Sequence, residues 1–134
     1  MAANTLDHVN IVAQDLDVSA RFYVTLLGLE RRNGPMGLSA DKVQWLYDHT
    51  GRPIIHLVVA EVGDALVRPA TPSQTGTGAI HHVAFECYEY DAMVAGLDAR
   101  GATYETRDYP SIGLRQVFTT DPGNVMLELN FRGA

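Results

Sequence analysis

This 134-residue sequence is poor in cysteine, in long apolar runs and in basic residues. Its one cysteine, Cys87, cannot form a disulfide within the chain. No apolar run approaches the roughly 20 residues that a membrane-spanning helix needs. Residues 1–5 lack the basic and apolar regions of a signal peptide, so we expect a cytoplasmic protein without a membrane-spanning segment.

Positive charge is scarce because 10 Lys and Arg stand against 16 Asp and Glu, for a net charge of -6. The basic residues are scattered, and the pair Arg31 and Arg32 is their densest point. Nucleic-acid-binding proteins usually gather Lys and Arg in a patch or stripe, so nucleic acid is not an expected partner. The length suits a single domain over residues 1–134.

What the sequence does contain is one pattern that occurs twice. In the first half, short segments alternate apolar and polar residues, as strands with one buried face do. Another segment has helical spacing, with N-capping candidates Asp15, Asp17 and Ser19 near its start and Gly28 at its end. We expect a helix over residues 18–27 and strands over residues 6–13, 29–33, 42–48 and 54–60.

The second half repeats this order after a connector rich in Pro, Gly, Ser and Thr. We expect Asp91 to cap a helix over residues 92–100 that ends at Gly101. Asp121-Pro122-Gly123-Asn124 predicts a tight turn before the last strand. The remaining predictions are strands over residues 80–87, 103–107, 114–120 and 125–131, and two βαβββ modules at about 5–62 and 79–132 joined by a linker at about 63–78.

The spacing of matched residues supports a duplication. His8 and His82 lie 74 residues apart, Gly28 and Gly101 lie 73 apart, and His56 and Glu128 lie 72 apart. The two halves therefore stay in step to within two residues. This register places the two first-strand histidines at one equivalent position, and His56 and Glu128 at another.

The four polar residues share one face of the predicted sheets. Their apolar neighbours alternate toward the helices, so His8, His56, His82 and Glu128 project from the opposite face. Three imidazoles and one carboxylate suit a borderline divalent ion such as Fe²⁺, Mn²⁺, Ni²⁺, Co²⁺ or Zn²⁺. If the two halves close around this face, the four groups converge into a metal site with positions open for substrate.

Simpler interpretations apply to each histidine taken alone. A single histidine on a half-apolar strand is more often a satisfied core or cleft residue than a ligand. His81 is expected to point to the helix side and to be a bystander, while His49 lies in a turn and is expected to be solvated. Cys87 alternates with the helix-facing residues and is expected to be an inert core thiol.

Three segments are distinctive: Leu6-Asp7-His8-Val9, the helix end Phe22-Tyr23-x-x-Leu26-Leu27-Gly28-Leu29-Glu30, and Asp121-Pro122-Gly123-Asn124-Val125-x-Leu127-Glu128-Leu129. Together with the paired halves, they resemble the vicinal oxygen chelate superfamily, which contains glyoxalases, extradiol dioxygenases, fosfomycin-resistance transferases and bleomycin-binding proteins. The resemblance spans nearly the whole chain and implies an α+β fold, with two βαβββ modules forming a curved, incompletely closed mixed β-sheet barrel and helices outside. It also implies a homodimer.

Within that superfamily, His8, His82 and Glu128 resemble the metal triad of extradiol dioxygenases, which implies Fe²⁺ or Mn²⁺. His56 falls where those enzymes keep an acid-base histidine, and it is open whether it acts in that way or as a fourth ligand. The dioxygenase tyrosine ten positions before the glutamate is Phe118 here, so ring cleavage would need a substitute such as Tyr109.

Other residues are expected to line the substrate pocket. Asn10 shares the face of His8, and Asn130 that of Glu128. Trp45 and Phe118 could form aromatic walls, although ordinary sheet packing is an equal alternative. Arg115 could meet an anionic group of the substrate, or pair with a surface acid.

Three functions follow from these observations. The first is a metal-dependent enzyme acting on a small molecule with vicinal oxygens, most like an extradiol dioxygenase. The second is a glyoxalase-like lyase or isomerase, although glyoxalases usually carry a carboxylate at the position of His56. The third is a metal-free binding protein of the bleomycin-resistance type.

Overall fold

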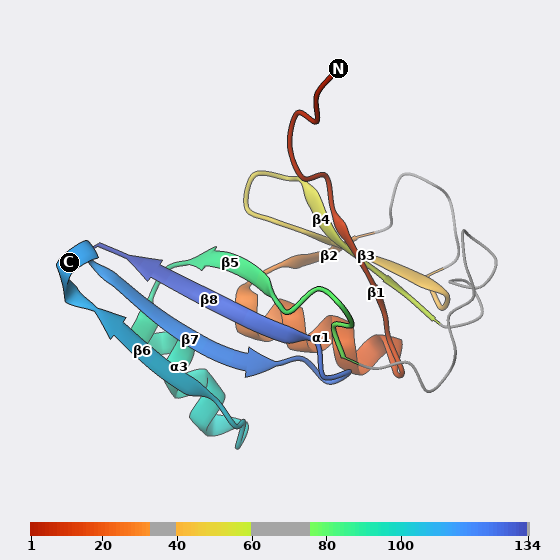
Figure 1. Cartoon of the computed structure of the whole chain (residues 1–134). Helices are drawn as coiled ribbons and strands as arrows, with labels where there is room; N and C mark the ends of the chain where they lie inside the picture. The colour runs from red at the N-terminus through yellow and green to blue at the C-terminus, as the bar shows by residue number, and fades with distance from the viewer. Residues whose placement is uncertain (33–39, 60–75, 134) are drawn as a thin grey trace. The chain divides into compact units, whose positions relative to one another are not determined.

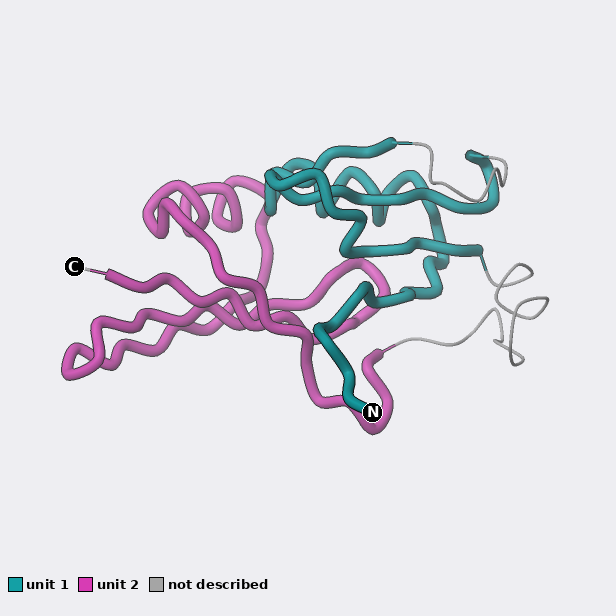
Figure 2. The backbone as a smooth tube through the Cα atoms, turned by 90° about the horizontal axis from the view of Figure 1, so that it is seen from above, with its two compact units in different colours: residues 1–74 teal, residues 75–134 magenta. Residues whose placement is uncertain are grey.

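The computed structural model describes residues 1–32, 40–59 and 76–133, and divides the chain into two compact units (Figure 2). Unit 1 is residues 1–74 and unit 2 is residues 75–134. The division falls inside the predicted linker, most of which lies outside the described residues. Each unit is described by itself.

The described residues of unit 1 form one helix and one four-stranded mixed sheet (Figure 1). The strand order is β1-β4-β3-β2, with β1 parallel to β4 and the other neighbours antiparallel. The predicted order β-α-β-β-β is confirmed, with slightly shorter strands. The elements are β1 (Val9–Val12), α1 (Leu16–Leu27), β2 (Glu30–Arg32), β3 (Val43–Tyr47) and β4 (Pro53–Val58).

Unit 2 has the same arrangement (Figure 1). Its strand order is β5-β8-β7-β6, again with one parallel pair, β5 and β8. The α+β class and the duplicated topology are thus confirmed. The elements are β5 (Val83–Cys87), α3 (Tyr90–Ala99), β6 (Glu105–Tyr109), the 3-10 turn η1 (Pro110–Ile112), β7 (Leu114–Thr120) and β8 (Met126–Arg132).

The ends of the two helices differ. Asp15 caps α1 by accepting a 3.0 Å hydrogen bond from the backbone N–H of Val18, and Gly28 ends it in the left-handed region at φ 68°. The prediction that Asp91 caps the second helix is wrong. Glu89 occupies that position with φ 61° and makes no side-chain capping bond, while Asp91 lies in the first turn of α3.

Several strand boundaries also differ from the predictions. The second strand of unit 2 was expected over residues 103–107, but β6 begins two residues later, at Glu105. All five of its residues are exposed, so the strand has no alternation of apolar and polar positions to mark its start. His8 and His82 were expected within strands, but each directly precedes one, β1 and β5 respectively.

The predicted turn before β8 is built around one side chain. Oδ1 of Asp121 accepts hydrogen bonds from the backbone N–H of Gly123 and of Val125, at 2.8 and 2.9 Å. Asn124 completes the turn with a left-handed φ of 65° and donates its backbone N–H to the carbonyl oxygen of Asp121. This turn sets the register with which β8 returns beside β7.

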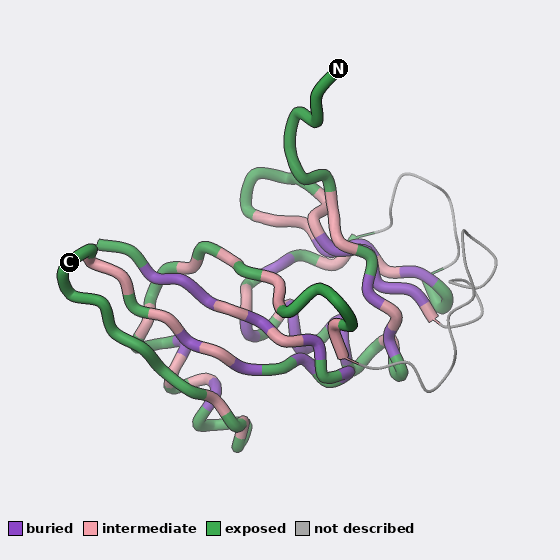
Figure 3. The backbone as a smooth tube through the Cα atoms, viewed as in Figure 1, coloured by how far each residue is buried: buried purple, intermediate pink, exposed green. Residues whose placement is uncertain are grey.

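In both units, buried residues lie on the helix and along the strands (Figure 3). In unit 1, α1 contacts β2, β3 and β4 and buries Phe22, Tyr23 and Leu26. In unit 2, α3 buries Met93 and Leu97. The strand residues that alternate toward these helices include the nearly fully buried Leu46, Ile55, Leu57, Val117, Leu127 and Leu129.

The pairing of the strands agrees with the repeat at His56 and Glu128. His56 lies beside Asn10 on the parallel strand and opposite Trp45 on the antiparallel one. Glu128 lies in the same way beside Ala84 and opposite Phe118. His56 and Glu128 therefore occupy the same ladder position in the two units, as their spacing in the sequence predicts.

Neither helix in the described part of the chain has the length and apolar character needed to cross a membrane.

Candidate metal site

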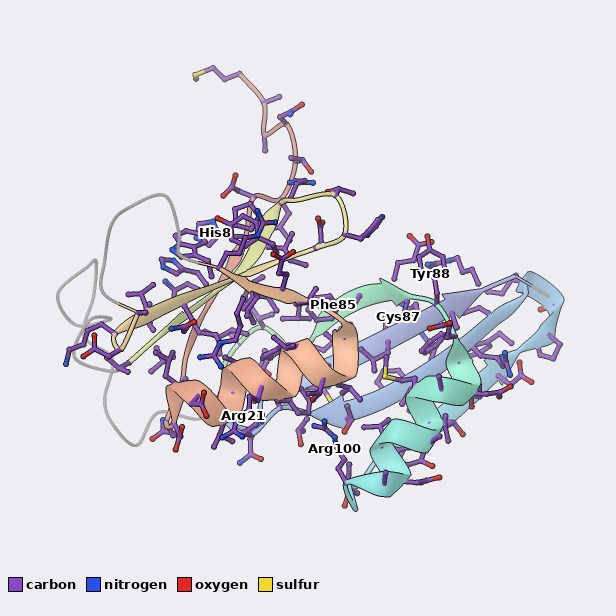
Figure 4. All side chains as sticks on the ribbon, turned by 180° about the vertical axis from the view of Figure 1, so that it is seen from behind. His8, Arg21, Phe85, Cys87, Tyr88 and Arg100 are labelled. Atoms are coloured by element: carbon purple, nitrogen blue, oxygen red, sulfur yellow. The ribbon has the colours of Figure 1, made fainter. Side chains whose placement is uncertain are left out.

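In unit 1, two histidines and a tryptophan meet on the face of the sheet opposite α1. The ring of His8, which enters from the residue before β1, lies 5.7 Å from the ring of His56 on β4 (Figure 4). The ring of His8 is also 5.7 Å from that of Trp45 on β3. Trp45 and His56 are ladder partners, and their rings stack 3.7 Å apart and 18° from parallel.

His56 is held as a neutral imidazole. Its side chain is only 3% exposed. Burial, with a smaller contribution from the neighbouring charge of His8, lowers the pKa of His56 to about 4. Its Nε2 atom is buried and has no hydrogen-bond partner among the residues that the structure describes. A buried polar atom without a partner is uncommon and costs free energy, so it calls for an explanation.

Apolar residues surround His56 on this face of the sheet. Val43, Trp45 and Val58 form a buried cluster, and Val12 and Tyr47 pack against it. Trp45 is buried in this cluster and stacks on His56, which is the ordinary sheet packing expected as the alternative. Its role as an aromatic wall for a substrate stays a prediction. Asn10, the parallel neighbour of His56 in the ladder, is exposed.

In unit 2, the equivalent corner of the sheet is formed by His82 and Glu128 and contains a carboxylate. Nε2 of His82 lies 3.7 Å from Oε1 of Glu128. The side chains of His82 and Glu128 are 34% and 16% exposed, so both remain accessible to a ligand. A carboxylate and an imidazole at this separation leave room for a shared positive ion, or for an ion pair if the imidazole is protonated.

A chain of amide hydrogen bonds holds the second carboxylate oxygen of Glu128, Oε2. Nδ2 of Asn130 donates to Oε2 of Glu128 at 2.9 Å, and Nε2 of Gln116 donates to Oδ1 of Asn130 at 3.0 Å. Because Gln116 occupies the amide oxygen of Asn130, the amide nitrogen of Asn130 faces the carboxylate. The prediction that Asn130 belongs to this corner thus has a direct contact behind it, whereas Gln116 was not predicted.

The residue before each first-strand histidine contacts that histidine. Nδ1 of His8 is 2.6 Å from Oδ2 of Asp7. Nδ1 of His82 is 2.9 Å from Nδ1 of His81. The expectation that His81 is a bystander is therefore wrong, because its ring engages His82 directly.

Arg115 lies on the wrong face of its strand to join this corner. Its guanidinium group stacks 3.9 Å from the centre of the Tyr90 ring, at the start of α3. Arg115 and Phe118 are three residues apart on β7, so alternation places their side chains on opposite faces of the sheet. Arg107 of β6 lies on the face of Phe118, with its guanidinium carbon 5.0 Å from the centre of that ring. This position follows from the pairing of Glu105 with Phe118, and the fully exposed β6 gives no alternation in the sequence that could have identified it.

Tyr109 is too far along the sheet to replace the missing tyrosine hydroxyl. Phe118 is the direct ladder partner of Glu128, whereas Tyr109 pairs with Leu114, four residues further along β7. Four residues of strand correspond to about 13 Å. In addition, Tyr109 lies two strands away from β8.

Two further expectations concern residues outside the site. His49 is exposed in the turn between β3 and β4, as predicted. Cys87 at the end of β5 is partly buried (Figure 4), and burial, with a smaller effect of the Glu86 carboxylate, raises the pKa of its thiol to about 11. The thiol is therefore protonated at neutral pH, in agreement with an inert role.

Each unit thus brings together two of the four predicted ligands. Within residues 1–32, 40–59 and 76–133, no group of three or more His, Cys, Asp or Glu side chains forms a metal cluster. The convergence of the pair His8 and His56 with the pair His82 and Glu128 stays a prediction. The donors themselves suit a borderline divalent ion, and the unpartnered Nε2 of His56 is the kind of atom that such an ion binds.

Comparison with known proteins gives a family for the whole chain. The sequence profile of the Glyoxalase/Bleomycin resistance protein/Dioxygenase superfamily matches residues 5–129. An uncharacterized protein of Escherichia coli strain K12, YaeR, is 30% identical over 123 residues, which cover 91% of this chain and 92% of that protein. Glyoxylase I 4 of Arabidopsis thaliana is 27% identical over 127 residues, covering 93% and 69%.

Solved structures of the same fold agree with this match. A lactoylglutathione lyase from Agrobacterium tumefaciens has a TM-score of 0.69 at 18% identity, covering 98% of this chain and 96% of that one. A mutant FosX fosfomycin resistance protein from Listeria monocytogenes, complexed with Mn(II) and a dihydroxypropylphosphonic acid, has a TM-score of 0.71 at 17% identity, covering 98% and 95%. The chain belongs to the Glyoxalase/Bleomycin resistance protein/Dioxygenase superfamily.

Proposed function

We propose that this chain is a divalent-metal-dependent enzyme that acts on a small molecule with two adjacent oxygens. His8, His82 and Glu128 are the ligands, and His56 completes the set. The buried Nε2 of His56, which has no partner among the described residues, is the observation that carries the proposal. The superfamily contains the Mn(II)-bound FosX structure, which supports a metal in a chain of this fold.

His56 suits the role of a fourth ligand better than that of an acid-base group. A group that exchanges protons during turnover works best with a pKa near the working pH, whereas the pKa of His56 is lowered to about 4. A neutral imidazole keeps its nitrogen lone pair at neutral pH and can bind a metal. If His56→Ala loses the metal, His56 is a ligand. If this variant keeps the metal and loses turnover, the acid-base role is correct instead.

The other residues of the site hold the ligands in place and shape the pocket. The bond from Asn130, backed by Gln116, leaves Oε1 of Glu128 facing His82. Trp45 restricts the imidazole of His56 by stacking on it. A divalent ion bound at these residues would supply Lewis-acid chemistry to the two oxygens of the substrate.

Two reaction classes remain, and the described residues favour the one that needs no phenolic acid. An extradiol dioxygenase is what the triad His8, His82 and Glu128 resembles, with Fe²⁺ or Mn²⁺. Phe118 faces Glu128 without a hydroxyl, and Tyr109 is about 13 Å further along the sheet. A lyase or isomerase with Zn²⁺, Ni²⁺, Co²⁺ or Mn²⁺ requires no hydroxyl at that position.

The experiment is an anaerobic reconstitution of metal-free protein with each of the five ions, followed by assays on catechols and on hemithioacetals. Turnover of a hemithioacetal without O₂ supports the lyase or isomerase. Ring cleavage that begins only when O₂ is admitted supports the dioxygenase. A protein that takes up none of these ions is better explained as a metal-free binding protein of the bleomycin-resistance type.

We also propose a homodimer. The pair His8 and His56 could then share an ion with His82 and Glu128 of the same chain or with those of the partner chain. Mixing the inactive variants His8→Ala and Glu128→Ala distinguishes these two arrangements. If each site draws one pair of ligands from each chain, half of the sites in a mixed dimer have all four ligands intact and activity returns. If each site is built within one chain, every site lacks a ligand and the mixture stays inactive. Light scattering measures the oligomeric state itself.

A further inference from the structure

The same local contact occurs at both first-strand histidines. Nδ1 of His8 contacts the side chain of Asp7 at 2.6 Å, and Nδ1 of His82 contacts the side chain of His81 at 2.9 Å. Asp7 and His81 are equivalent in the repeat, since each directly precedes its histidine. The two units thus have different side chains at this position, but in both of them the side chain contacts Nδ1 of the histidine that follows.

The engaged nitrogen determines what the other nitrogen can do. A neutral imidazole carries one proton, and the nitrogen without it offers a lone pair. Oδ2 of the ionised Asp7 can only accept a hydrogen bond, so Nδ1 of His8 donates to it. The proton is then on Nδ1, and Nε2 of His8 is left with the lone pair.

In unit 2, the position of the carboxylate shows which nitrogen faces the site. Nε2 of His82 is the ring atom 3.7 Å from Oε1 of Glu128. For Nε2 to bind an ion shared with Glu128, the proton of His82 must sit on Nδ1 and point to Nδ1 of His81. His81 then accepts this bond and carries its own proton on Nε2.

We propose that Asp7 and His81 are positioning residues that fix the tautomer and the ring orientation of the two histidine ligands. The inference rests on the proposed metal site. Partners of this kind on ligand histidines typically contribute about 10- to 100-fold in metal affinity. They act through the histidine and do not touch the metal or the substrate.

The two contacts differ in strength. The bond to Asp7 is charge-assisted, whereas the bond between two neutral imidazoles is not, and charge-assisted bonds are roughly twice as strong. Asp7 is also largely exposed, with 90% of its side chain accessible, which weakens its bond through competition with water. We expect Asp7→Ala to lower metal affinity about 30-fold and His81→Ala about tenfold.

The first test uses the metal-free protein and reads the tautomer directly. ¹⁵N NMR at pH 8 distinguishes a proton on Nδ1 from one on Nε2 in a neutral imidazole. We expect His8 and His82 in the wild-type chain to carry it on Nδ1. Asp7→Ala should move the proton of His8 toward Nε2 and leave His82 unchanged, and His81→Ala should do the converse.

The second test measures metal affinity by chelator competition. Asp7→Asn and His81→Asn keep an acceptor oxygen and should retain affinity within about threefold of wild type, unlike the alanine variants. Asp108→Ala and His49→Ala are matched controls, since they remove an exposed acid and an exposed histidine elsewhere. Equal affinities for the alanine variants and the wild type would overturn the proposal, as would a wild-type tautomer with the proton on Nε2.

The two tests separate this inference from the proposed function. If the wild type takes up no metal but its histidines carry the proton on Nδ1 and lose it in the variants, the proposed metal site fails and the tautomer contacts stand. If the wild type binds metal and the variants change neither affinity nor tautomer, the metal site stands and the roles of Asp7 and His81 fail. A fold check by circular dichroism excludes trivial unfolding of any variant.

Discussion

The two units share one backbone plan and differ in the chemistry of one face. In unit 1, the ladder neighbours Val43 and Val58 lie in an apolar cluster beside His56. In unit 2, the equivalent neighbours are Gln116 and Asn130. Gln116 donates a hydrogen bond to Asn130, and Asn130 donates one to Glu128. The same position therefore carries a neutral, buried imidazole in one unit and a hydrogen-bonded carboxylate in the other.

This difference shows how a duplicated scaffold can carry unlike polar side chains at one ladder position. A carboxylate in the place of His56 would lack the amide donor that Asn130 provides, and burying it would be costly. An imidazole in the place of Glu128 would remove the negative charge that balances a divalent ion. The surroundings of each corner thus match the group that it carries, and exchanging parts between the units tests this match.

The largest effect is expected from removing the charge of unit 2. Glu128→Gln keeps the shape of the side chain but removes the charge of the proposed ligand, so metal affinity should fall by more than about 100-fold, beyond the effect of an outer partner. Chelator competition measures it. Glu105→Gln, an exposed acid on β6, is the control and should bind as wild type does. Equal loss in both variants would point to general electrostatics.

Placing the carboxylate of unit 2 in the corner of unit 1 should destabilise the metal-free protein. His56→Glu buries an acid among Trp45, Val43 and Val58 without a donor, at a cost of about 3 kcal/mol in the free energy of unfolding at pH 7. Urea denaturation measures this cost. The uncharged variant His56→Gln should lose much less of the free energy of unfolding. If both variants are equally stable, the corner is more polar than the contacts indicate.

The lowered pKa of His56 predicts a dependence of stability on pH. An unfolded histidine takes up a proton near pH 6.5, whereas His56 in the folded protein does so only near pH 4. Between these values the unfolded state binds more protons, so the free energy of unfolding of the metal-free protein falls as the pH is lowered, by up to about 3 kcal/mol. His56→Phe should remove this part of the pH dependence. An unchanged profile in that variant would contradict the assignment.

Making unit 2 resemble unit 1 should have a smaller effect. Asn130→Val removes the donor to Glu128 and leaves Gln116 without its acceptor, which should lower metal affinity about 10- to 100-fold. Gln116→Val should cost less, because it leaves the bond between Asn130 and Glu128 in place. An order of effects opposite to this one would mean that Gln116 contacts the ligand in its own right.

The smallest effect concerns the two helices. Glu89 begins α3 in the left-handed region without a capping bond, whereas Asp15 caps α1. Glu89→Gly should raise the free energy of unfolding by about 1 kcal/mol, because glycine adopts that conformation without strain. Asp15→Ala should lower it by about 1 kcal/mol through the lost cap. Denaturant titrations of both variants measure the two opposite signs.

Alternation and repeat spacing in the sequence predict much of the fold. They identify the eight strands and two helices of the described residues and the equivalence of His56 and Glu128, because buried faces leave a period of two or 3.6 residues. They fail where no face is buried. The start of β6 was misplaced because Glu105 to Tyr109 are all exposed, and the face of Arg115 follows only from the ladder of β7 with β8.

The candidate site is predictable in its members but not in its contacts. His8, His56, His82 and Glu128 follow from residue type and repeat position. The roles of Asp7, His81 and Gln116 depend on side-chain rotamers, which no periodicity reports. His81 illustrates this limit. Simple alternation would send it to the opposite face from His82, but both residues precede β5, where the strand geometry does not yet apply.

The most direct test of the account is the stoichiometry and affinity of divalent metal binding to the wild-type chain and to the variants His8→Ala, His56→Ala, His82→Ala and Glu128→Ala. We expect one ion per chain, with each substitution lowering affinity by at least about 100-fold, in excess of an outer-partner effect. Binding that is lost only in the variants of one unit, or no binding to the wild type, would contradict a metal site shared by the two units.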